Sequence, residues 1–350
     1  MPEDADGHQP DQPPPKPRRR FTASGAGVAI GGIVAGIEQQ LFKTTPPVEE
    51  LVARGKPIAP VPAAGGGTLT VSMPGDPIEL MTDPDRLTLT APGVDVVIDL
   101  AIGGRVASFR IDDHELLRTE GHGPIQYGSY PMAPYAGRIR EGRFSFEGRD
   151  YTLPITMETH AIHGTVLDRR WQVVGEATGT TAEIETDLGP DWPFRGRARQ
   201  RFELTGDALT FELAVDADEP MPASVGWHPW FFRRAFGEDA AVRVDLDAEW
   251  MFVRDAAGIT TPELIPAPPE PWDDCFAGVR RSPVLRWLRA LELTVESPCP
   301  FWVVYTVPED AVCVEPQTAP PNALNGTATI VEPGRPLVAT MTWRWRRLES

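Results

Sequence analysis

A single carboxylate at the end of an apolar run is the first candidate for chemistry. Ala311–Val314 leads directly into Glu315, which is followed by Pro316. The residue types predict a β-strand that the proline ends immediately after Glu315. In an extended chain residues 311, 313 and 315 share one face, so Glu315 continues a row of small side chains that leaves room for a ligand. Burying a carboxylate there costs free energy, so we expect it to have a function in binding or catalysis. The alternative interpretation is a solvated glutamate at a strand end.

A histidine among aromatic residues is the second candidate. His228 lies between Trp227 and Trp230, and Pro229 rigidifies the chain after it. Aromatic walls around an imidazole suit stacking on the apolar face of a sugar ring. The alternative is a histidine packed in the core.

Three further segments supply polar groups. Arg138 enters an apolar strand start, and its guanidinium can donate several hydrogen bonds to sugar or carboxylate oxygens. His163 precedes Gly164, which permits a tight backbone beside it. Asp273 and Asp274 bring two carboxylates that can accept hydrogen bonds from sugar hydroxyls. Each segment also has a structural interpretation, as a surface arginine, a structural histidine or a pair of loop carboxylates.

Composition narrows the class of partner. The 350 residues include 50 acidic and 33 basic side chains, a formal charge of -17, which opposes binding to nucleic acid or to an anionic membrane surface. The expected partner is small and uncharged, or binds through a local site. The three cysteines show no CxxC spacing, so the sequence predicts neither a disulfide framework nor a structural zinc site, and a reducing compartment is the simpler setting. No HExxH motif occurs, and the sequence shows no other metal signature.

The N-terminal residues differ from the rest of the chain. Residues 1–20 are rich in Pro, Asp and Gln and end in a basic cluster, which predicts a flexible tail. Residues 21–37 lack charge, and with the preceding arginines they resemble a twin-arginine export signal, although no clear Ala-x-Ala cleavage site follows. We expect a short helical segment near residues 28–54, a linker at 57–67 and a cytoplasmic protein, with export as the alternative.

From Thr68 onward the chain consists of short runs rich in Val, Ile, Thr, Phe and Trp, closed by Gly, Asp, Asn or Pro. Turn signals at 147–150 and 205–207 predict hairpins, and helical periodicity is nearly absent. This pattern predicts an all-β domain over residues 68–350, a large antiparallel β-sandwich, with a barrel or two smaller sandwiches as alternatives. The expected strands include 68–71, 87–90, 94–100, 142–148, 182–186, 198–204 and 209–215.

Five motifs occur in one order across most of residues 69–346, and together they resemble the aldose 1-epimerase (mutarotase) family. They are Ala136-Gly137-Arg138-Ile139, His163-Gly164, Gly226-Trp227-His228-Pro229-Trp230-Phe231, the run Asp273 to Phe276, and Glu315-Pro316-Gln317-Thr318 with Pro321-Asn322-Ala323. The resemblance implies the large antiparallel β-sandwich of galactose mutarotase-like proteins, in agreement with the strand pattern.

The resemblance also implies a reaction and roles. An aldose changes anomer when its C1 hydroxyl loses a proton while the ring oxygen gains one, so that the ring opens. By resemblance Glu315 is the base and His228 the acid, which requires an ionised Glu315 and an at least partly protonated His228 near neutral pH. The resemblance also implies that His163 lies close to the ring oxygen or to neighbouring hydroxyls of the aldose and that Arg138 and Asp273 orient its hydroxyls. Trp230 would form a wall of the site, and Gln317 would fix the Glu315 loop. No metal or organic cofactor is implied.

The chain departs from the family pattern at three positions. Gly137 stands where asparagine is frequent, Thr165 where a second glycine is common, and Trp230 where tyrosine is usual. These departures bear on the identity of the sugar more than on the reaction. The sequence leaves open whether the protein is a monomer or a homodimer.

Three alternatives remain. A hexose-6-phosphate 1-epimerase would need phosphate donors, for which Arg140, Arg169 and Arg170 are candidates. A non-catalytic carbohydrate-binding protein would not need a matched acid and base. A glycoside hydrolase would need two carboxylates, formally Glu315 and Asp273, and would leave His228 without a role.

Overall fold

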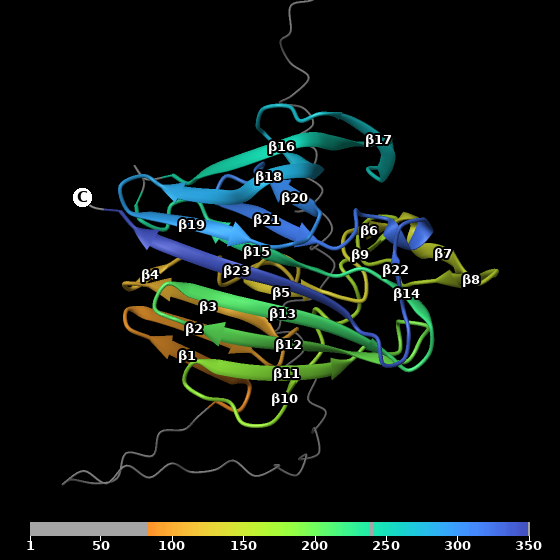
Figure 1. Cartoon of the computed structure of the whole chain (residues 1–350), viewed down its shortest axis with the longest axis horizontal. Coiled ribbons are helices and arrows are strands. Elements are labelled where there is room, and N and C mark those ends of the chain that lie inside the picture. The colour runs from red at the N-terminus through yellow and green to blue at the C-terminus, as the bar shows by residue number, and fades with distance from the viewer. Residues whose placement is uncertain (1–82, 238–240, 349–350) are drawn as a thin grey trace, which may run out of the picture. The chain divides into compact units, whose positions relative to one another are not determined.

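The computed structural model describes residues 83–237 and 241–348, which form an all-β unit (Figure 1). All described residues belong to one compact unit. The expected tail, helical segment, linker and the strand at 68–71 lie outside the described residues. Within the described residues, no helix has the length and apolar character needed to cross a membrane.

β-Strands make up nearly all of the regular structure, and the two helices of the described residues are single 3₁₀ turns. The strands are β1 (Arg86–Ala91), β2 (Val94–Asp99), β3 (Arg105–Ile111), β4 (His114–Glu115), β5 (Ser129–Met132), β6 (Arg138–Ile139), β7 (Arg143–Phe146), β8 (Arg149–Thr152), β9 (Ala161–Ile162), β10 (Gln172–Val173), β11 (Thr181–Asp187), β12 (Gly196–Leu204), β13 (Ala208–Ala217), β14 (Met221–Ala223), β15 (Gly226–Phe232), β16 (Arg243–Arg254), β17 (Thr260–Pro266), β18 (Asp273–Trp287), β19 (Leu291–Glu296), β20 (Phe301–Tyr305), β21 (Ala311–Gln317), β22 (Thr329–Val331) and β23 (Leu337–Arg347), and the 3₁₀ turns are η2 (Arg140–Gly142) and η3 (Ala323–Asn325).

Antiparallel pairing arranges the main sheet as two series of strands that meet at β18. One series runs β10–β11–β12–β13–β23–β19–β18. The other runs β1–β2–β3–β5–β15–β21–β20–β18. The long strand β18 also pairs with β16, which carries β17 as the edge of the sheet in Figure 1. The sheet therefore curls back on itself, and the two series become the layers of the expected sandwich.

The main core lies between the two series. Trp343 of β23 is fully buried, and its ring centroid lies 5.2 Å from that of Phe109 on β3, 4.7 Å from that of Phe211 on β13 and 5.0 Å from that of Phe231 on β15. Aromatic rings at such separations pack favourably and bury large apolar areas. The core thus joins strands of both layers.

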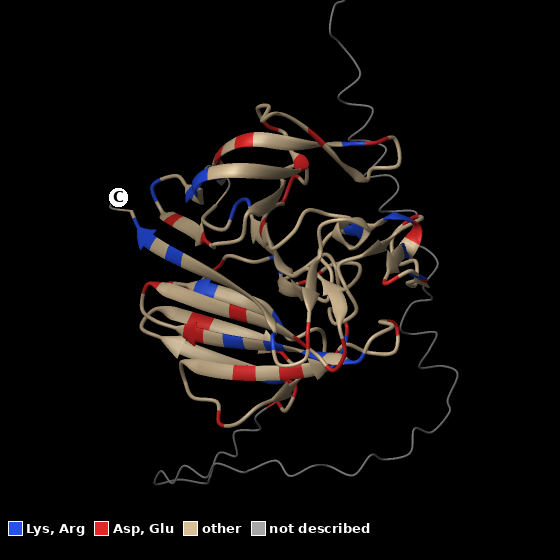
Figure 2. Ribbon diagram, turned by 45° about the vertical axis from the view of Figure 1, so that its right-hand side comes forward, with Lys and Arg blue, Asp and Glu red and all other residues tan. Residues whose placement is uncertain are grey.

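Cross-strand ion pairs cover the outer face of β11, β12 and β13. Figure 2 shows acidic residues along β11 beside basic residues on the neighbouring strand β12. Arg199 lies 2.9 Å from Asp216 and 3.8 Å from Glu183, and Arg197 lies 3.5 Å from Glu185. Exposed pairs of this kind contribute little stability individually, on the order of 0–1 kcal/mol.

Strand alternation gives β15 and β21 two different faces. Trp227 and Phe231 of β15 and Val312 and Val314 of β21 belong to the main core. The intervening residues face the other way, into a second and smaller apolar cluster made of Tyr130, Met132, Ala136, Leu167, Trp230, Ala311 and Cys313. The period-two arrangement expected for residues 311 to 315 is present, and it points Glu315 away from the main core.

The fold prediction is confirmed, with one local correction. β7 pairs with β8 and β12 with β13, as the two hairpin turns predicted. Pro316 was expected to end its strand, but β21 continues to Gln317, and Pro316 pairs with Trp302 of β20. A proline removes one backbone donor, and the pairs on either side of it hold the strand in register.

Candidate active site

Strand register places the two principal candidates opposite each other. On the antiparallel pair β15–β21, Gly226 faces Gln317 and Trp230 faces Cys313, so His228 falls opposite Glu315. On the other side His228 faces Tyr130 of β5. Directly opposed residues on one face of a sheet have touching side chains. Three strands thus form the row Tyr130, His228, Glu315.

The acid and base candidates are in direct contact and buried. His228 Nε2 lies 3.3 Å from Glu315 Oε1, and the two side chains are 8% and 2% exposed. Gln317 Nε2 donates to Glu315 Oε2 at 3.3 Å, so the amide fixes the second carboxylate oxygen. The Tyr130 and Trp230 rings stack on His228 with centroids 5.0 and 5.1 Å away. Two aromatic rings thus stack on the imidazole, and its Nε2 edge faces the carboxylate.

Trp230 supports the imidazole and has its own polar group satisfied. Its indole Nε1 donates to the carbonyl of Ile125 at 2.9 Å, and Arg118 lies over its ring at 4.4 Å. The wall predicted at this position is therefore built against His228. The N–H that replaces a tyrosine hydroxyl is occupied by the protein backbone.

His163 reaches the same site from the loop after β9. Its ring lies perpendicular to that of His228, with centroids 5.1 Å apart. The backbone around it is tight, because Gly164 has φ +85° and a Cβ there would lie 2.0 Å from the carbonyl oxygen of Ala133. This explains the glycine of the motif. His160, three residues earlier, is structural: its Nδ1 accepts from the backbone N–H of Glu141.

Arg138 lies on β6, where it pairs with Ile162 of β9. Its positive charge lowers the pKa of both His163 and Glu315, which places the guanidinium within electrostatic reach of the site. Within the part of the chain that the structure describes, it has no carboxylate partner. Its Nη2 lies 3.8 Å from Met157 Sδ, a weak acceptor, so its stronger donors are available to a ligand.

Asp273 begins β18 and is held by a residue that the sequence interpretation missed. Arg254, the last residue of β16, lies with Nη1 2.9 Å from Asp273 Oδ2 and Nε 3.1 Å from Asp274 Oδ1. The charge of Asp273 raises the pKa of Glu315, so the two carboxylates sense each other. Pairing of β16 with β18 brings Arg254 here, and no motif in the sequence marks it.

Burial opposes charge on the central pair. It raises the pKa of Glu315 well above its ordinary value, with a further increase from Asp273. It lowers the pKa of His228 to about 3 and that of His163 well below its ordinary value. Burial therefore favours a protonated Glu315 beside a neutral His228, whereas the sequence interpretation expected the ionised pair.

Polar atoms without a partner also concentrate here. Among the described residues, His163 Nδ1, His228 Nδ1 and Gln317 Oε1 are buried without a hydrogen bond. Such groups are costly in a folded protein and usually acquire a partner. Their gathering around Glu315 is typical of a site built to receive a polar ligand.

One group of the described residues brings together atoms of metal-ligand type. These are a ring nitrogen of His228, the sulfur of Cys313 and a carboxylate oxygen of Glu315, all within 4.8 Å of one another. Burial raises the pKa of the Cys313 thiol well above its ordinary value, and the protonated thiol is a poor metal ligand. The chemistry of the donor set does not favour a metal, and the absence of a cofactor stays a prediction.

The three arginines proposed as phosphate donors are each paired with a carboxylate. Arg140 bonds Asp255, Arg169 lies 2.7 Å from Asp187, and Arg170 lies 2.5 Å from Asp85. A phosphate would have to displace or rearrange each of these pairs.

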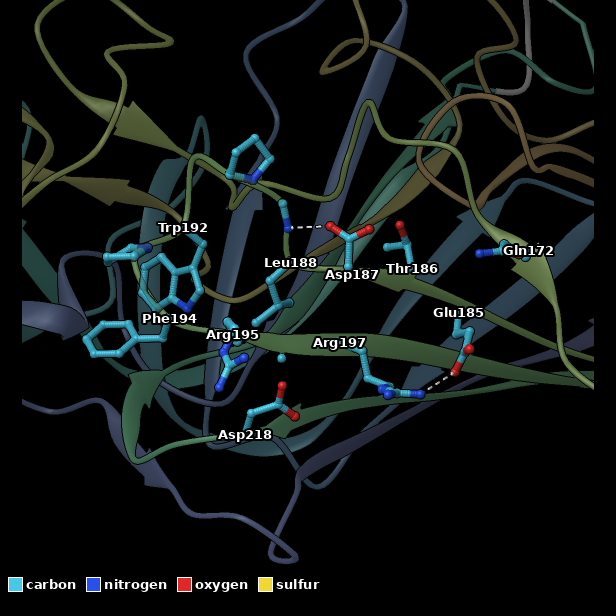
Figure 3. A pocket seen from close by; sticks show the side chains of 14 residues that line it. Gln172, Glu185, Thr186, Asp187, Leu188, Trp192, Phe194, Arg195, Arg197 and Asp218 are labelled. Carbon is cyan, nitrogen blue, oxygen red and sulfur yellow. Dashed lines mark hydrogen bonds and ion pairs between the residues drawn. The ribbon is translucent and has the colours of Figure 1, made fainter. Parts of the chain in front are cut away.

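A separate cavity of about 550 Å³ is lined by the loop that joins β11 to β12 and by the adjoining ends of both strands (Figure 3). None of the sequence-predicted site residues lines it. Its charged side chains are largely paired, Arg197 with Glu185 and Asp187 with Arg169. Trp192 and Phe194 are buried at 3% and 7% exposure and offer no open stacking surface. We place the candidate site at His228 and Glu315.

The structure thus brings most of the sequence-predicted residues together. His228, Glu315, Gln317, His163 and Trp230 are joined by direct contacts, and Arg138 and Asp273 act on Glu315 through their charges. Tyr130, Cys313 and Arg254 were not predicted as site residues. The strand-pairing register would have identified Tyr130 and Cys313, because Tyr130 faces His228 and Cys313 faces Trp230.

Comparisons with solved structures agree with this fold. A galactose mutarotase-like protein of Clostridium acetobutylicum superposes with a TM-score of 0.65 at 18% identity, covering 75% of this chain and 95% of that one. A galactose 1-epimerase from Lactobacillus acidophilus gives a TM-score of 0.63 at 16% identity, and the superposition covers 81% of this chain and 100% of that one. At these identities the likeness shows the fold alone.

Sequence comparison gives the family. The uncharacterized protein YphB of Escherichia coli K12 is 30% identical over 135 residues, which span 37% of this chain and 46% of that protein. Uncharacterized protein YihR of the same organism is 29% identical over 114 residues, 31% of this chain and 37% of that protein. The matched stretches thus span less than half of either relative. The family model for aldose 1-epimerase matches residues 85–344, which include every site residue described above. The chain therefore belongs to the aldose 1-epimerase family.

Proposed function

We propose that this protein is a cofactor-independent mutarotase that interconverts the α and β anomers of an unphosphorylated aldose, with Glu315 as the base and His228 as the acid. The observation that carries the proposal is the buried contact of 3.3 Å between His228 Nε2 and Glu315 Oε1. The two oxygens that must exchange protons, the C1 hydroxyl and the ring oxygen, are bonded to the same carbon. Two protein groups this close can reach both.

The reaction needs two proton transfers and no net change in composition. Glu315 removes the proton from the C1 hydroxyl, the C1–O1 bond becomes a carbonyl, and the bond from C1 to the ring oxygen breaks. His228 donates a proton to the departing ring oxygen. Rotation about the C1–C2 bond followed by the reverse transfers gives the other anomer.

The pair starts with one proton, and burial favours its position on Glu315. Direct contact allows this proton to pass to His228. The Gln317 amide and the Arg138 charge both lower the pKa of Glu315, so they favour the ionised carboxylate that the base requires. Sugar hydroxyls that donate to Glu315 would act in the same direction.

The surrounding groups fit a neutral sugar. Arg138 can donate to hydroxyls and Asp273 can accept from them, while the buried unpaired atoms of His163 and Gln317 have capacity for further hydrogen bonds. The phosphorylated alternative is less well supported, because its proposed donors are held in ion pairs. A binding protein without turnover would not require the contact between an acid and a base.

Polarimetry tests the proposal directly. Freshly dissolved α-D-glucose and α-D-galactose should relax to their anomeric mixtures faster with the wild type than without protein. The catalysed rate should fall by about 10²- to 10⁴-fold in both Glu315→Gln and His228→Asn, the range for loss of a general acid or base. His114→Asn and Glu296→Gln are matched controls, because His114 is exposed on β4 and Glu296 lies on β19 in an ion pair with Arg344. Both controls should retain the wild-type rate.

Each contrary result has a distinct meaning. Normal turnover in Glu315→Gln would remove the base assignment. Acceleration of glucose 6-phosphate alone would favour the phosphorylated alternative. Saturable sugar binding by folded wild type with no acceleration of any of these sugars would favour the binding protein.

A further inference from the structure

We propose that Arg254 is a positioning residue, which fixes the Asp273 carboxylate so that one of its oxygens is presented to a sugar hydroxyl. The inference rests on the proposed function and extends it to a residue outside the sequence motifs. It is carried by the contacts that join Arg254, Asp273 and Asp274.

These three residues form a closed arrangement. Arg254 Nη1 donates to Asp273 Oδ2 at 2.9 Å, and its Nε lies 3.1 Å from Asp274 Oδ1. The other oxygen of Asp274, Oδ2, accepts the backbone N–H of Asp273 at 3.3 Å. Asp274 thus anchors both the guanidinium and the backbone from which the Asp273 side chain projects.

The position of Asp273 relative to the catalytic pair follows from strand register. Asp273 faces Tyr305 on β20, and Tyr305 faces Cys313 on β21. Cys313 in turn faces Trp230 on β15. This row runs beside the row that contains His228 and Glu315, on the same face of the sheet.

One oxygen of Asp273 is left for a ligand. Arg254 uses Oδ2, and within the described ranges 83–237 and 241–348 no hydrogen bond is made to Oδ1. The side chain of Asp273 is 32% exposed and that of Arg254 is 31% exposed, so both remain accessible at the rim of the site. A carboxylate oxygen in this situation accepts a hydrogen bond from a hydroxyl donor.

The geometry specifically requires an arginine. Its rigid fork holds two carboxylates at once through Nη1 and Nε, whereas the single ammonium of a lysine is a point charge. A lysine at position 254 would keep the charge and lose the bridge. This difference separates positioning of Asp273 from simple neutralisation of its charge.

A matched arginine exists away from the site. Arg280 on β18 also contacts two carboxylates, with Nη1 3.2 Å from Asp247 and Nη2 3.6 Å from Glu249. Neither carboxylate is a candidate sugar contact. Arg280→Met therefore controls for the loss of a bridging arginine as such.

The experiment measures kcat and KM by polarimetry for Arg254→Met, Arg254→Lys and Arg280→Met. Arg254→Met should lower kcat/KM by about 10- to 100-fold, the range for losing a hydrogen bond to a charged group, mainly through a higher KM. Arg254→Lys should recover only part of this loss, and Arg280→Met should behave as wild type. In a double-mutant cycle, Arg254→Met should add little to Asp273→Asn, because both changes remove the same hydroxyl contact.

A crystal structure of Arg254→Met provides a readout independent of activity. The Asp273 carboxylate should leave its wild-type orientation. If it keeps that orientation, or if the two changes in the cycle are additive, the positioning role is wrong even when the wild type is an active mutarotase. If the wild type accelerates no sugar, the proposed function fails, and a displaced Asp273 carboxylate would still establish that Arg254 positions it.

Discussion

Pro321 occupies the space that a side chain at position 137 would need. A Cβ on Gly137 would lie 2.7 Å from Pro321 Cβ and 2.8 Å from its Cγ, and the backbone of Gly137 has φ +70°. Two motifs far apart in the sequence therefore meet here, next to Arg138. A side chain larger than that of glycine at position 137 would therefore force Pro321 or the backbone of residue 137 to shift.

Gly137→Asn should consequently destabilise the protein. Asparagine tolerates a left-handed backbone, so the expected cost of about 1–3 kcal/mol arises from overpacking against Pro321. Gly148→Asn is the matched control, because Gly148 has φ +75° and a Cβ added there would meet nothing within 4 Å. Urea unfolding of the two variants checks the prediction, and equal losses of stability in both would show that the contact with Pro321 is not the cause.

The pH dependence of kcat/KM should reveal the buried pair. The pKa of His228 is lowered to about 3 and that of Glu315 is raised, so between these limits the pair holds one proton. Below the lower apparent pKa a second proton binds, and the pair contains no base. Above the upper apparent pKa the pair has lost its proton, and it contains no acid. The charges of Asp273 and Arg138 act on Glu315 and that of Arg118 acts on His228, and the two apparent pKa values belong to the coupled pair.

The profile should therefore be a broad bell whose acid limb lies well below pH 6.5, the ordinary value for histidine. Polarimetry with correction for spontaneous mutarotation measures it, together with a check at each pH that the protein stays folded. An acid limb near pH 6.5 would mean that the free enzyme contains a protonated His228 at lower pH, contrary to the burial argument.

Arg138→Ala should mainly weaken sugar binding. The guanidinium has only a weak sulfur partner among the described residues, so its removal deprives a sugar of donors while leaving no carboxylate unpaired. KM should rise about 10-fold or more, consistent with losing a charge-assisted hydrogen bond. Arg143→Ala serves as the control, because Arg143 is exposed and lies 3.9 Å from Glu141. Unchanged sugar affinity in Arg138→Ala would exclude this residue as a substrate contact.

Local patterns in the sequence were sufficient to predict the fold class and the face of the strand that carries Glu315. Alternation of residue types determines which side chains of a strand point together, and this held from Ala311 to Glu315. A different local rule, that a proline ends a strand, failed at Pro316. Pairing with β15 and β20 keeps the strand extended beyond the proline.

Long-range pairing could not be read from the sequence. Tyr130 meets His228 through the register of β5 with β15, and Arg254 meets Asp273 through the pairing of β16 with β18. Neither contact leaves a local pattern, because each depends on which strands become neighbours. The protonation state was also missed: a carboxylate next to a histidine suggests an ion pair, but the depth of burial is a property of the fold and favours the neutral pair.

Arg105 links the stability of the fold to the site. It is fully buried, and its guanidinium donates to the carbonyls of Ile102, Pro124, Tyr127 and Leu167 at 2.5 to 3.0 Å. Burial lowers its pKa, and carbonyl oxygens take the place of water around the charge. Its guanidinium carbon also lies 5.3 Å from the centroid of the Tyr130 ring, which stacks on His228.

Arg105→Met should therefore cost about 3–5 kcal/mol, the range for breaking a buried charged network, since four carbonyls lose their donor. Arg335→Met is the control, because Arg335 is 82% exposed and pairs only with Glu332 among the described residues, and it should change stability by less than about 1 kcal/mol. Urea unfolding followed by tryptophan fluorescence measures both. Because Tyr130 and the 124–127 loop would lose a common anchor, the folded fraction of Arg105→Met should also show a lower kcat. If Arg105→Met instead has the stability and the kcat of the wild type, the four carbonyls find other donors, and Arg105 anchors neither the fold nor the site.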